Sequence, residues 1–170
     1  MFVYFKKSVF WLLGIWAILC IKVGAESNYK FKKWEDIPFV TRSTGDLLLD
    51  VFRSDDSKIR PVVLCLHGGF WAKGSKKFMH PLAKDLVKKG YVAVCSNYRL
   101  TDVAPAPAQL HDVFSAIRFL REKATDYGID PEKIGVTGSS AGGYLAVMAA
   151  VFDTGDKSCL LYTSPSPRDS

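Results

Sequence analysis

The sequence predicts an α/β fold in which helices flank a mostly parallel sheet. Three short runs, residues 61–66, 91–95 and 134–137, are apolar without alternation. Such runs are typical of strands that are covered on both faces. Stretches with a helical spacing of apolar residues separate and follow them. Strands that alternate with helices form parallel sheets with right-handed crossovers, so these observations indicate one α/β domain.

Two further strands are predicted before the buried runs. Residues 37–41 and 47–52 flank a turn at Ser43-Thr44-Gly45-Asp46 and have the pattern of a hairpin. Residues 28–34, which precede them, are polar and aromatic, and we expect an irregular lead-in there.

Two helices are predicted between the buried strands. The first covers residues 79–90, with Gly90 as its stop signal. The second covers residues 110–125, and Gly128 is the stop signal that follows it. Residues 102–107 are the most irregular stretch of the chain. We expect them to form a loop over the carboxyl edge of the sheet, where ligands bind in such folds.

The first 25 residues have the pattern of a secretory signal peptide. Lys6 and Lys7 precede an apolar run over residues 9–21, and small residues follow up to Ala25. A helix of that run spans about 20 Å, short of the ~30 Å hydrocarbon core of a bilayer. We expect cleavage after Ala25, a secreted or periplasmic protein, and no membrane attachment afterwards. An uncleaved N-terminal anchor is the alternative.

Composition limits the classes of function. The 170 residues are enough for one domain, and the formal net charge is +6, part of which lies in the leader. Lys76-Lys77 and Lys88-Lys89 are interpreted as solvated helix ends, so no nucleic-acid partner is expected. Cys65 and Cys95 lie inside apolar strands and are expected to be buried free thiols. The sequence has no metal-ligand spacing, and no cofactor is expected.

One pattern indicates a catalytic serine. Residues 138–142 read G-S-S-A-G and fit G-x-S-x-G between a strand and an alanine-rich helix. A serine at this turn is held in a strained backbone conformation, and the flanking glycines remove Cβ atoms that would collide. Ser140 is therefore the candidate nucleophile, and the helix start behind it favours negative charge. The pattern alone also fits an ordinary Gly/Ser turn.

A second motif, His67-Gly68-Gly69-Phe70-Trp71, follows the strand over residues 61–66. Consecutive glycines at a strand end let backbone N–H groups turn toward a ligand. Ester hydrolysis needs such donors for its oxyanion, and one donor is worth about 3 kcal/mol of barrier. Gly68, Gly69 and Ala141 are the candidate donors. A plain glycine turn is the alternative.

These motifs, together with N-Y-R-L at 97–100, P-A-Q-L-H-D at 107–112 and the segment 128–146, resemble the α/β-hydrolase fold. The resemblance is to the esterase and lipase branch related to hormone-sensitive lipase and to exported acetyl- and feruloyl-ester hydrolases. It covers about residues 35–152 and implies the N-terminal part of that fold.

The resemblance also implies roles for individual residues. Ser140 is implied as nucleophile and the amides of Gly68, Gly69 and Ala141 as the oxyanion hole. His67 is implied to shape that loop and not to act as the base. Trp71 is expected either to line the acyl pocket or simply to pack. A structural role is implied for the acid Asp112, which we expect to pair with Arg99.

The implied activity is that of a serine carboxylic-ester hydrolase that forms an acyl-enzyme on Ser140. Its substrate would be a small-molecule or carbohydrate ester, the latter by analogy only. In this fold the acid and the histidine follow the nucleophile, but His67, His80 and His111 all precede Ser140. An unactivated serine is a poor nucleophile, so the chain as written is expected to be inactive. A peptidase related to prolyl oligopeptidases and a non-catalytic hydrolase-like binding protein are the alternatives.

The last residues do not fit the fold. Residues 159–169 match the translation of a transposase-based sequencing adapter. We therefore expect a partial hydrolase domain over residues 26–158 and a non-native tail over residues 159–170. A short natural tail rich in Pro and Ser is the alternative. With the remaining strands absent, the far edge of the sheet is uncovered, and such a polypeptide is expected to aggregate.

Overall fold

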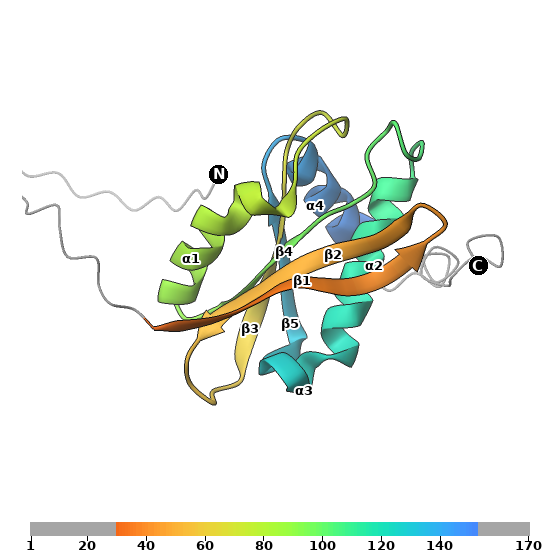
Figure 1. The fold of residues 1–170 in the computed structure, drawn as a ribbon. Coiled ribbons are helices and arrows are strands. Elements are labelled where there is room, and N and C mark those ends of the chain that lie inside the picture. The colour runs from red at the N-terminus through yellow and green to blue at the C-terminus, as the bar shows by residue number, and fades with distance from the viewer. Residues whose placement is uncertain (1–29, 153–170) are drawn as a thin grey trace, which may run out of the picture.

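A computed structural model describes residues 30–152 as one sheet of five strands with helices on both faces (Figure 1). The predicted leader, its cleavage site and the predicted tail lie outside these residues. The sheet order is β1-β2-β4-β3-β5. The strands are β1 (Phe31–Arg42), β2 (Gly45–Ser54), β3 (Arg60–Leu66), β4 (Val92–Ser96) and β5 (Ile129–Gly138).

The sheet is mixed, and its parallel part carries the loops of interest. β1 and β2 form the predicted antiparallel hairpin, and β2 also pairs antiparallel with β4. β3 lies between β4 and β5 and is parallel to both. The carboxyl ends of β3, β4 and β5 therefore meet at one edge of the sheet, which confirms the predicted α/β class.

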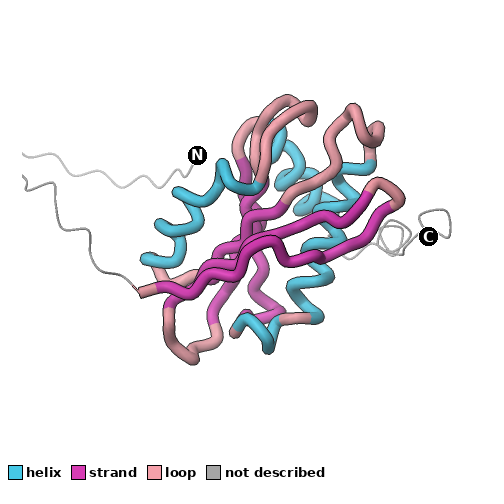
Figure 2. Tube along the Cα trace, in the orientation of Figure 1, coloured by secondary structure: helices cyan, strands magenta, loops and turns pink. Residues whose placement is uncertain are grey.

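Helices cover the two faces of the sheet unequally (Figures 1 and 2). α1 packs on one face with Phe52, Cys65, Ala93 and Cys95. α2 and α4 pack on the other face and cover the larger core. The helical elements are the 3₁₀ turn η1 (Lys76–Met79), α1 (His80–Lys88), α2 (Ala108–Glu122), α3 (Ala124–Tyr127) and α4 (Ala141–Phe152).

Several predicted boundaries were wrong. The lead-in expected over residues 28–34 is already strand from Phe31, because these residues pair with the end of β2. β5 begins at Ile129, five residues before the predicted start at Ile134, because Ile129 pairs with Arg60 of β3. The helix predicted over 110–125 is divided into α2 and α3, and Gly128 ends α3 in the left-handed region at φ 62°.

Two other predictions hold within the described residues. Cys65 and Cys95 are buried and free, and they face each other in register on β3 and β4. Residues 101–107 form an irregular loop before α2, as expected. None of the helices in residues 30–152 is long and apolar enough to cross a membrane.

Candidate active site

Ser140 occupies the turn that joins β5 to α4. Its φ is +49°, in the left-handed region that a residue with a side chain rarely adopts. The turn is tied to the sheet because the Ser139 N–H donates to the Leu66 carbonyl at 3.1 Å. On the helix side, the Tyr144 N–H donates to the Ser140 carbonyl at 3.0 Å. The Ser140 side chain is exposed at the carboxyl edge of the sheet.

The glycines of the G-x-S-x-G pattern are required by close packing of the backbone. A Cβ atom on Gly138 would lie 2.8 Å from the Gly143 nitrogen, and one on Gly142 would lie 2.6 Å from the His67 carbonyl oxygen. Both distances are shorter than real Cβ contacts allow. The sequence explanation for these two glycines is therefore supported by the geometry.

The second motif forms the first part of a loop between β3 and α1, which we call the glycine loop (residues 67–79). Gly69 has a φ of +124°, and its carbonyl accepts hydrogen bonds from Ala72 and Lys73, both at 3.1 Å. Further along, the Trp71 carbonyl accepts a bond of 2.9 Å from the Thr101 N–H. The loop thus turns sharply directly after β3.

The glycine loop meets the serine turn. A Cβ atom on Gly68 would lie 2.9 Å from the Ser139 carbonyl oxygen and 3.4 Å from the Ser140 Cβ. The two segments line one open hollow of about 560 Å³, together with the exposed side chains of Phe70 and Phe78. Four of its lining residues are Gly68, Gly69, Ser139 and Ser140.

Within residues 30–152, the backbone amides near Ser140 have no protein partner. In the described part of the chain, none of the backbone N–H groups of Gly68, Gly69 and Ala141 has a recorded hydrogen bond to a carbonyl outside regular helices and strands. Ala141 is the first residue of α4, where backbone N–H groups have no partner within the helix. Such groups are available to an anionic atom of a ligand.

His67 is a structural residue. It is 1% exposed, and its Nδ1–H donates to the Gly68 carbonyl at 2.8 Å. Its ring stacks on Tyr98 with centroids 4.2 Å apart, and the Tyr98 hydroxyl donates to the His67 carbonyl at 2.8 Å. Burial lowers the pKa of His67, an effect that its hydrogen bond to Gly68 offsets only in part. Burial raises the pKa of Tyr98 to about 12.

A second histidine, His80, is bound to a buried carboxylate. Nε2 of His80 lies 2.7 Å from Asp50 Oδ2, on the α1 side of the sheet. His111 lies in α2. The hydrogen bonds of His67 and His80 thus go to Gly68 and Asp50 and not to Ser140. Among residues 30–152, no group of His, Cys, Asp or Glu side chains is arranged to hold a metal ion.

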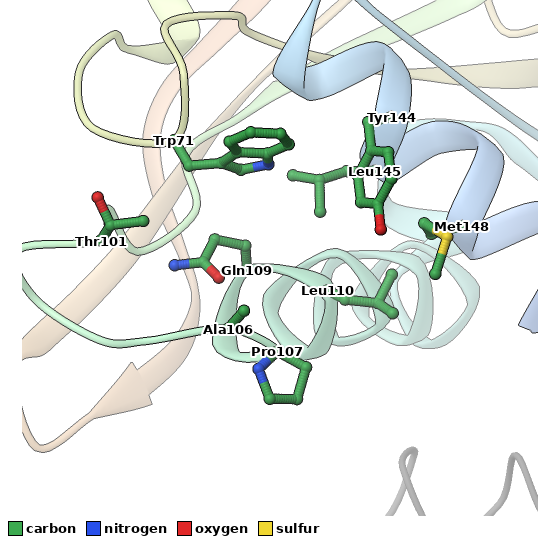
Figure 3. Close-up of a pocket in the computed structure, with 9 residues that line it drawn as sticks. All are labelled: Trp71, Thr101, Ala106, Pro107, Gln109, Leu110, Tyr144, Leu145 and Met148. Carbon is green, nitrogen blue, oxygen red and sulfur yellow. The ribbon is translucent and has the colours of Figure 1, made fainter.

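Trp71 lines a cavity, but not the one that contains Ser140. The cavity has a volume of about 310 Å³ and lies between the start of α2, α4 and the glycine loop (Figure 3). The Trp71 ring meets the Tyr144 ring edge-on, with centroids 5.6 Å apart. Gln109 and Leu110 of α2 and Leu145 and Met148 of α4 also line it. Trp71 is thus both packed and cavity-lining, and its role toward an acyl group stays a prediction.

The predicted pair between Asp112 and Arg99 is confirmed. The Arg99 backbone N–H and Nε donate to Asp112 Oδ2 at 3.0 and 2.9 Å. Arg42 of β1 also binds this carboxylate, with its Nε 3.1 Å from Oδ1. The side chain of Asp112 is completely buried, so this pair joins the hairpin, α2 and the segment after β4.

One interpretation from the sequence was wrong. Lys76, expected at a solvated helix end, is 3% exposed and binds Asp50 and Asp36. Only Lys77 of that pair is exposed. The signal that could have revealed this is Asp50 itself, a carboxylate inside an otherwise apolar strand, because a buried charge requires a buried partner.

Comparison with known proteins places the fold among esterases. The chain is 37% identical over 120 residues to esterase LipQ of Mycobacterium tuberculosis, covering 68% of this chain and 28% of LipQ. The structure matches that of an esterase of Thermogutta terrifontis with a TM-score of 0.62 at 31% identity, over 66% of this chain and 42% of the other. That esterase has also been solved bound to propionate, bound to butyrate, and phosphorylated by paraoxon.

A truncated carbohydrate esterase from the gut microbiota gives a TM-score of 0.66 at 30% identity, over 76% of this chain and 46% of that one. The chain therefore spans about a quarter of LipQ and less than half of each of these two esterases. The predicted α/β-hydrolase fold of the esterase branch is confirmed for the N-terminal part. The BD-FAE family model matches residues 49–166, a range that includes Gly68, Gly69, Ser140 and Ala141. The chain belongs to the BD-FAE family.

Proposed function

We propose that Ser140 is the nucleophile of a serine carboxylic-ester hydrolase. One observation carries the proposal: Ser140 is held at φ +49° beside the glycine loop, and the amides of Gly68, Gly69 and Ala141 have no recorded protein partner. A strained, exposed hydroxyl next to unpaired N–H groups is the arrangement that acyl transfer requires.

The reaction follows from this arrangement. The Ser140 oxygen attacks the acyl carbon and loses its proton to a base, while the carbonyl π electrons move to oxygen. The amides of Gly68, Gly69 and Ala141 stabilise that oxyanion. Its collapse expels the alcohol, which takes up the proton, and leaves an acyl-enzyme. Water then attacks the acyl carbon, releases the acid and restores the serine.

The general base that activates Ser140 is not supplied by His67 or His80. His67 is stacked on Tyr98 and donates to Gly68, and His80 is bound to Asp50. We place the base and its acid partner outside these 170 residues, in a protein as long as the esterases that the chain matches. On this proposal the 170-residue chain alone has little or no activity.

Relatives support both the chemistry and a substrate class. The related Thermogutta terrifontis esterase is phosphorylated by paraoxon, a reaction that needs an activated nucleophile, and it binds short carboxylates. A second neighbour is a carbohydrate esterase. We propose acyl groups on carbohydrates as the substrate. The leader pattern supports an exported protein, which would meet acylated carbohydrates outside the cell.

The test uses the intact protein that contains this chain and a short-chain nitrophenyl ester. Ser140→Ala should lower kcat/KM by about 10³-fold or more, since the covalent route is lost. Ser57→Ala, the same change in an exposed loop, should leave it unchanged. Paraoxon should modify the peptide that contains Ser140 and no other. Equal rates for wild type and Ser140→Ala would remove the nucleophile assignment, and an inactive intact protein would favour a non-catalytic binding role.

A further inference from the structure

Lys76 is a buried lysine at the far end of the glycine loop. Its Nζ lies 2.7 Å from Asp36 Oδ1 and 2.5 Å from Asp50 Oδ1. Its backbone N–H donates to the side-chain oxygen of Asn97 at 2.8 Å. Lys76 thus contacts strand β1, strand β2 and the residue that follows strand β4.

The surroundings of Lys76 keep the ion pair charged. Asp50 is fully buried, and it also accepts bonds from the Asp36 N–H at 2.8 Å and from His80 at 2.7 Å. Burial by itself would lower the pKa of Lys76, but its hydrogen bonds to Asp36 and Asp50 outweigh burial and raise it. Burial would likewise raise the pKa of Asp50, but its hydrogen bonds hold it below the ordinary value. Both groups are therefore ionised at neutral pH.

The segment just before Lys76 packs against the start of the glycine loop, beside Ser140. Gly74, two residues before Lys76, is folded back against the start of the loop. A Cβ atom on Gly74 would lie 2.5 Å from the Gly68 carbonyl oxygen and 3.0 Å from His67 Cε1. Because these segments are in direct contact, we expect a displacement of the loop at Lys76 to shift the backbone of Gly68.

We propose that Lys76 is a positioning residue, whose ion pairs with Asp50 and Asp36 hold the glycine loop so that the Gly68 and Gly69 amides face Ser140. Its effect on catalysis rests on the function proposed for Ser140. Its effect on the loop does not, and the two are measured separately.

The loop itself is tested by amide hydrogen exchange in the intact protein. Lys76→Met keeps the apolar part of the side chain but loses the charge. The hydrogen-bonded loop amides of Ala72, Lys73 and Phe78 should therefore exchange at least about tenfold faster than in wild type, while those of α2 stay the same. Lys77→Met, the same change at the exposed neighbour, should alter neither. Unchanged exchange of the glycine loop in Lys76→Met would overturn the proposal, even if the intact protein proves to have no esterase activity.

Kinetics then separate positioning from stability. Lys76→Met should lower kcat about 10- to 100-fold with KM within about threefold, because the amides act on charge that develops only in the transition state. The double variant Asp50→Asn/Lys76→Met removes the buried carboxylate that has lost its lysine, and it should recover the wild-type melting temperature while kcat stays low. Recovery of kcat together with the melting temperature would show that Lys76 only balances charge, and would overturn the positioning role.

Discussion

At the scale of single residues, Gly142 limits what the serine turn tolerates. A methyl group there would be 2.6 Å from the His67 carbonyl oxygen, where only backbone could move to relieve it. We predict that Gly142→Ala lowers the free energy of unfolding by about 1–3 kcal/mol, the usual cost of overpacking a well-packed site. Urea unfolding of the intact protein measures this change.

A matched glycine provides the control for that substitution. Gly135 lies in β5, close to the same turn, but a Cβ atom there would be 3.8 Å from the Val62 carbonyl oxygen, an ordinary contact. Gly135→Ala should change the free energy of unfolding by no more than about 0.5 kcal/mol. Equal losses for the two variants would mean that backbone freedom, and not close approach, explains Gly142.

Sequence motifs pointed to those residues of the candidate site whose identity is restricted by the local backbone. Ser140 and the two loop glycines were selected as candidates because strain and close approach restrict which residues fit there. Lys76 was missed because a lysine beside Lys77 has the same pattern whether it is solvated or buried. Its burial depends on Asp50 and Asp36, which precede it in the chain by 26 and 40 residues. Pairing over such separations is decided by the tertiary fold.

At the scale of secondary-structure elements, Asp112 fastens α2 to the hairpin and to the segment after β4. Its buried carboxylate binds Arg42 and Arg99 at once, and both arginine side chains are nearly buried. Asp112→Ala would leave these two guanidinium groups without their carboxylate. We predict a loss of about 3–5 kcal/mol in the free energy of unfolding, as for other broken buried ion pairs. Thermal and urea denaturation of the intact protein measure it.

An exposed ion pair on the next helix provides the comparison. Asp126 of α3 lies 3.6 Å from the Lys123 ammonium, and both side chains are more than half exposed. Asp126→Ala should cost less than about 1 kcal/mol, because solvent screens such pairs. If Asp112→Ala costs no more than Asp126→Ala, the buried carboxylate does not hold these elements together.

Elements with a strong pattern were predicted closely, and those that depend on a partner were not. β3 and β4 were placed to within one residue because they are continuous apolar runs. Residues 31–33 of β1 and 131–133 of β5 are exposed, so no apolar pattern marks them as strand. They become strand because β2 and β3 offer them hydrogen-bond partners.

At the scale of the whole molecule, the order of strands could not be read from the sequence. β4 lies between β2 and β3, so chain neighbours β2 and β3 are not paired. Periodicity identifies a buried strand but does not say which strand lies beside it. That choice is made by the helices: α1 covers one face and α2 with α4 the other, and each crossover must reach its own face.

The two edges of the described sheet differ in how they are protected. β1 carries Lys32, Lys33 and Pro38, which discourage pairing with another strand. β5 pairs only with β3 in the described residues, and its part next to the serine turn has no charged side chain. Beside it, α4 is apolar on all sides although Val147 is 62% exposed, whereas such helices are normally buried.

We predict that a polypeptide of residues 26–158 self-associates through β5 and the outer face of α4. Light scattering on fractions from size-exclusion chromatography should show oligomers. Val147→Lys should reduce their mass, because it places a charge on that face. Val103→Lys, at an apolar residue that is 46% exposed in the loop before α2, should not. A wild-type polypeptide that is monomeric and melts in one cooperative step would show that the uncovered edge is harmless. An equal effect of both lysines would show that added net charge, and not the α4 face, controls association.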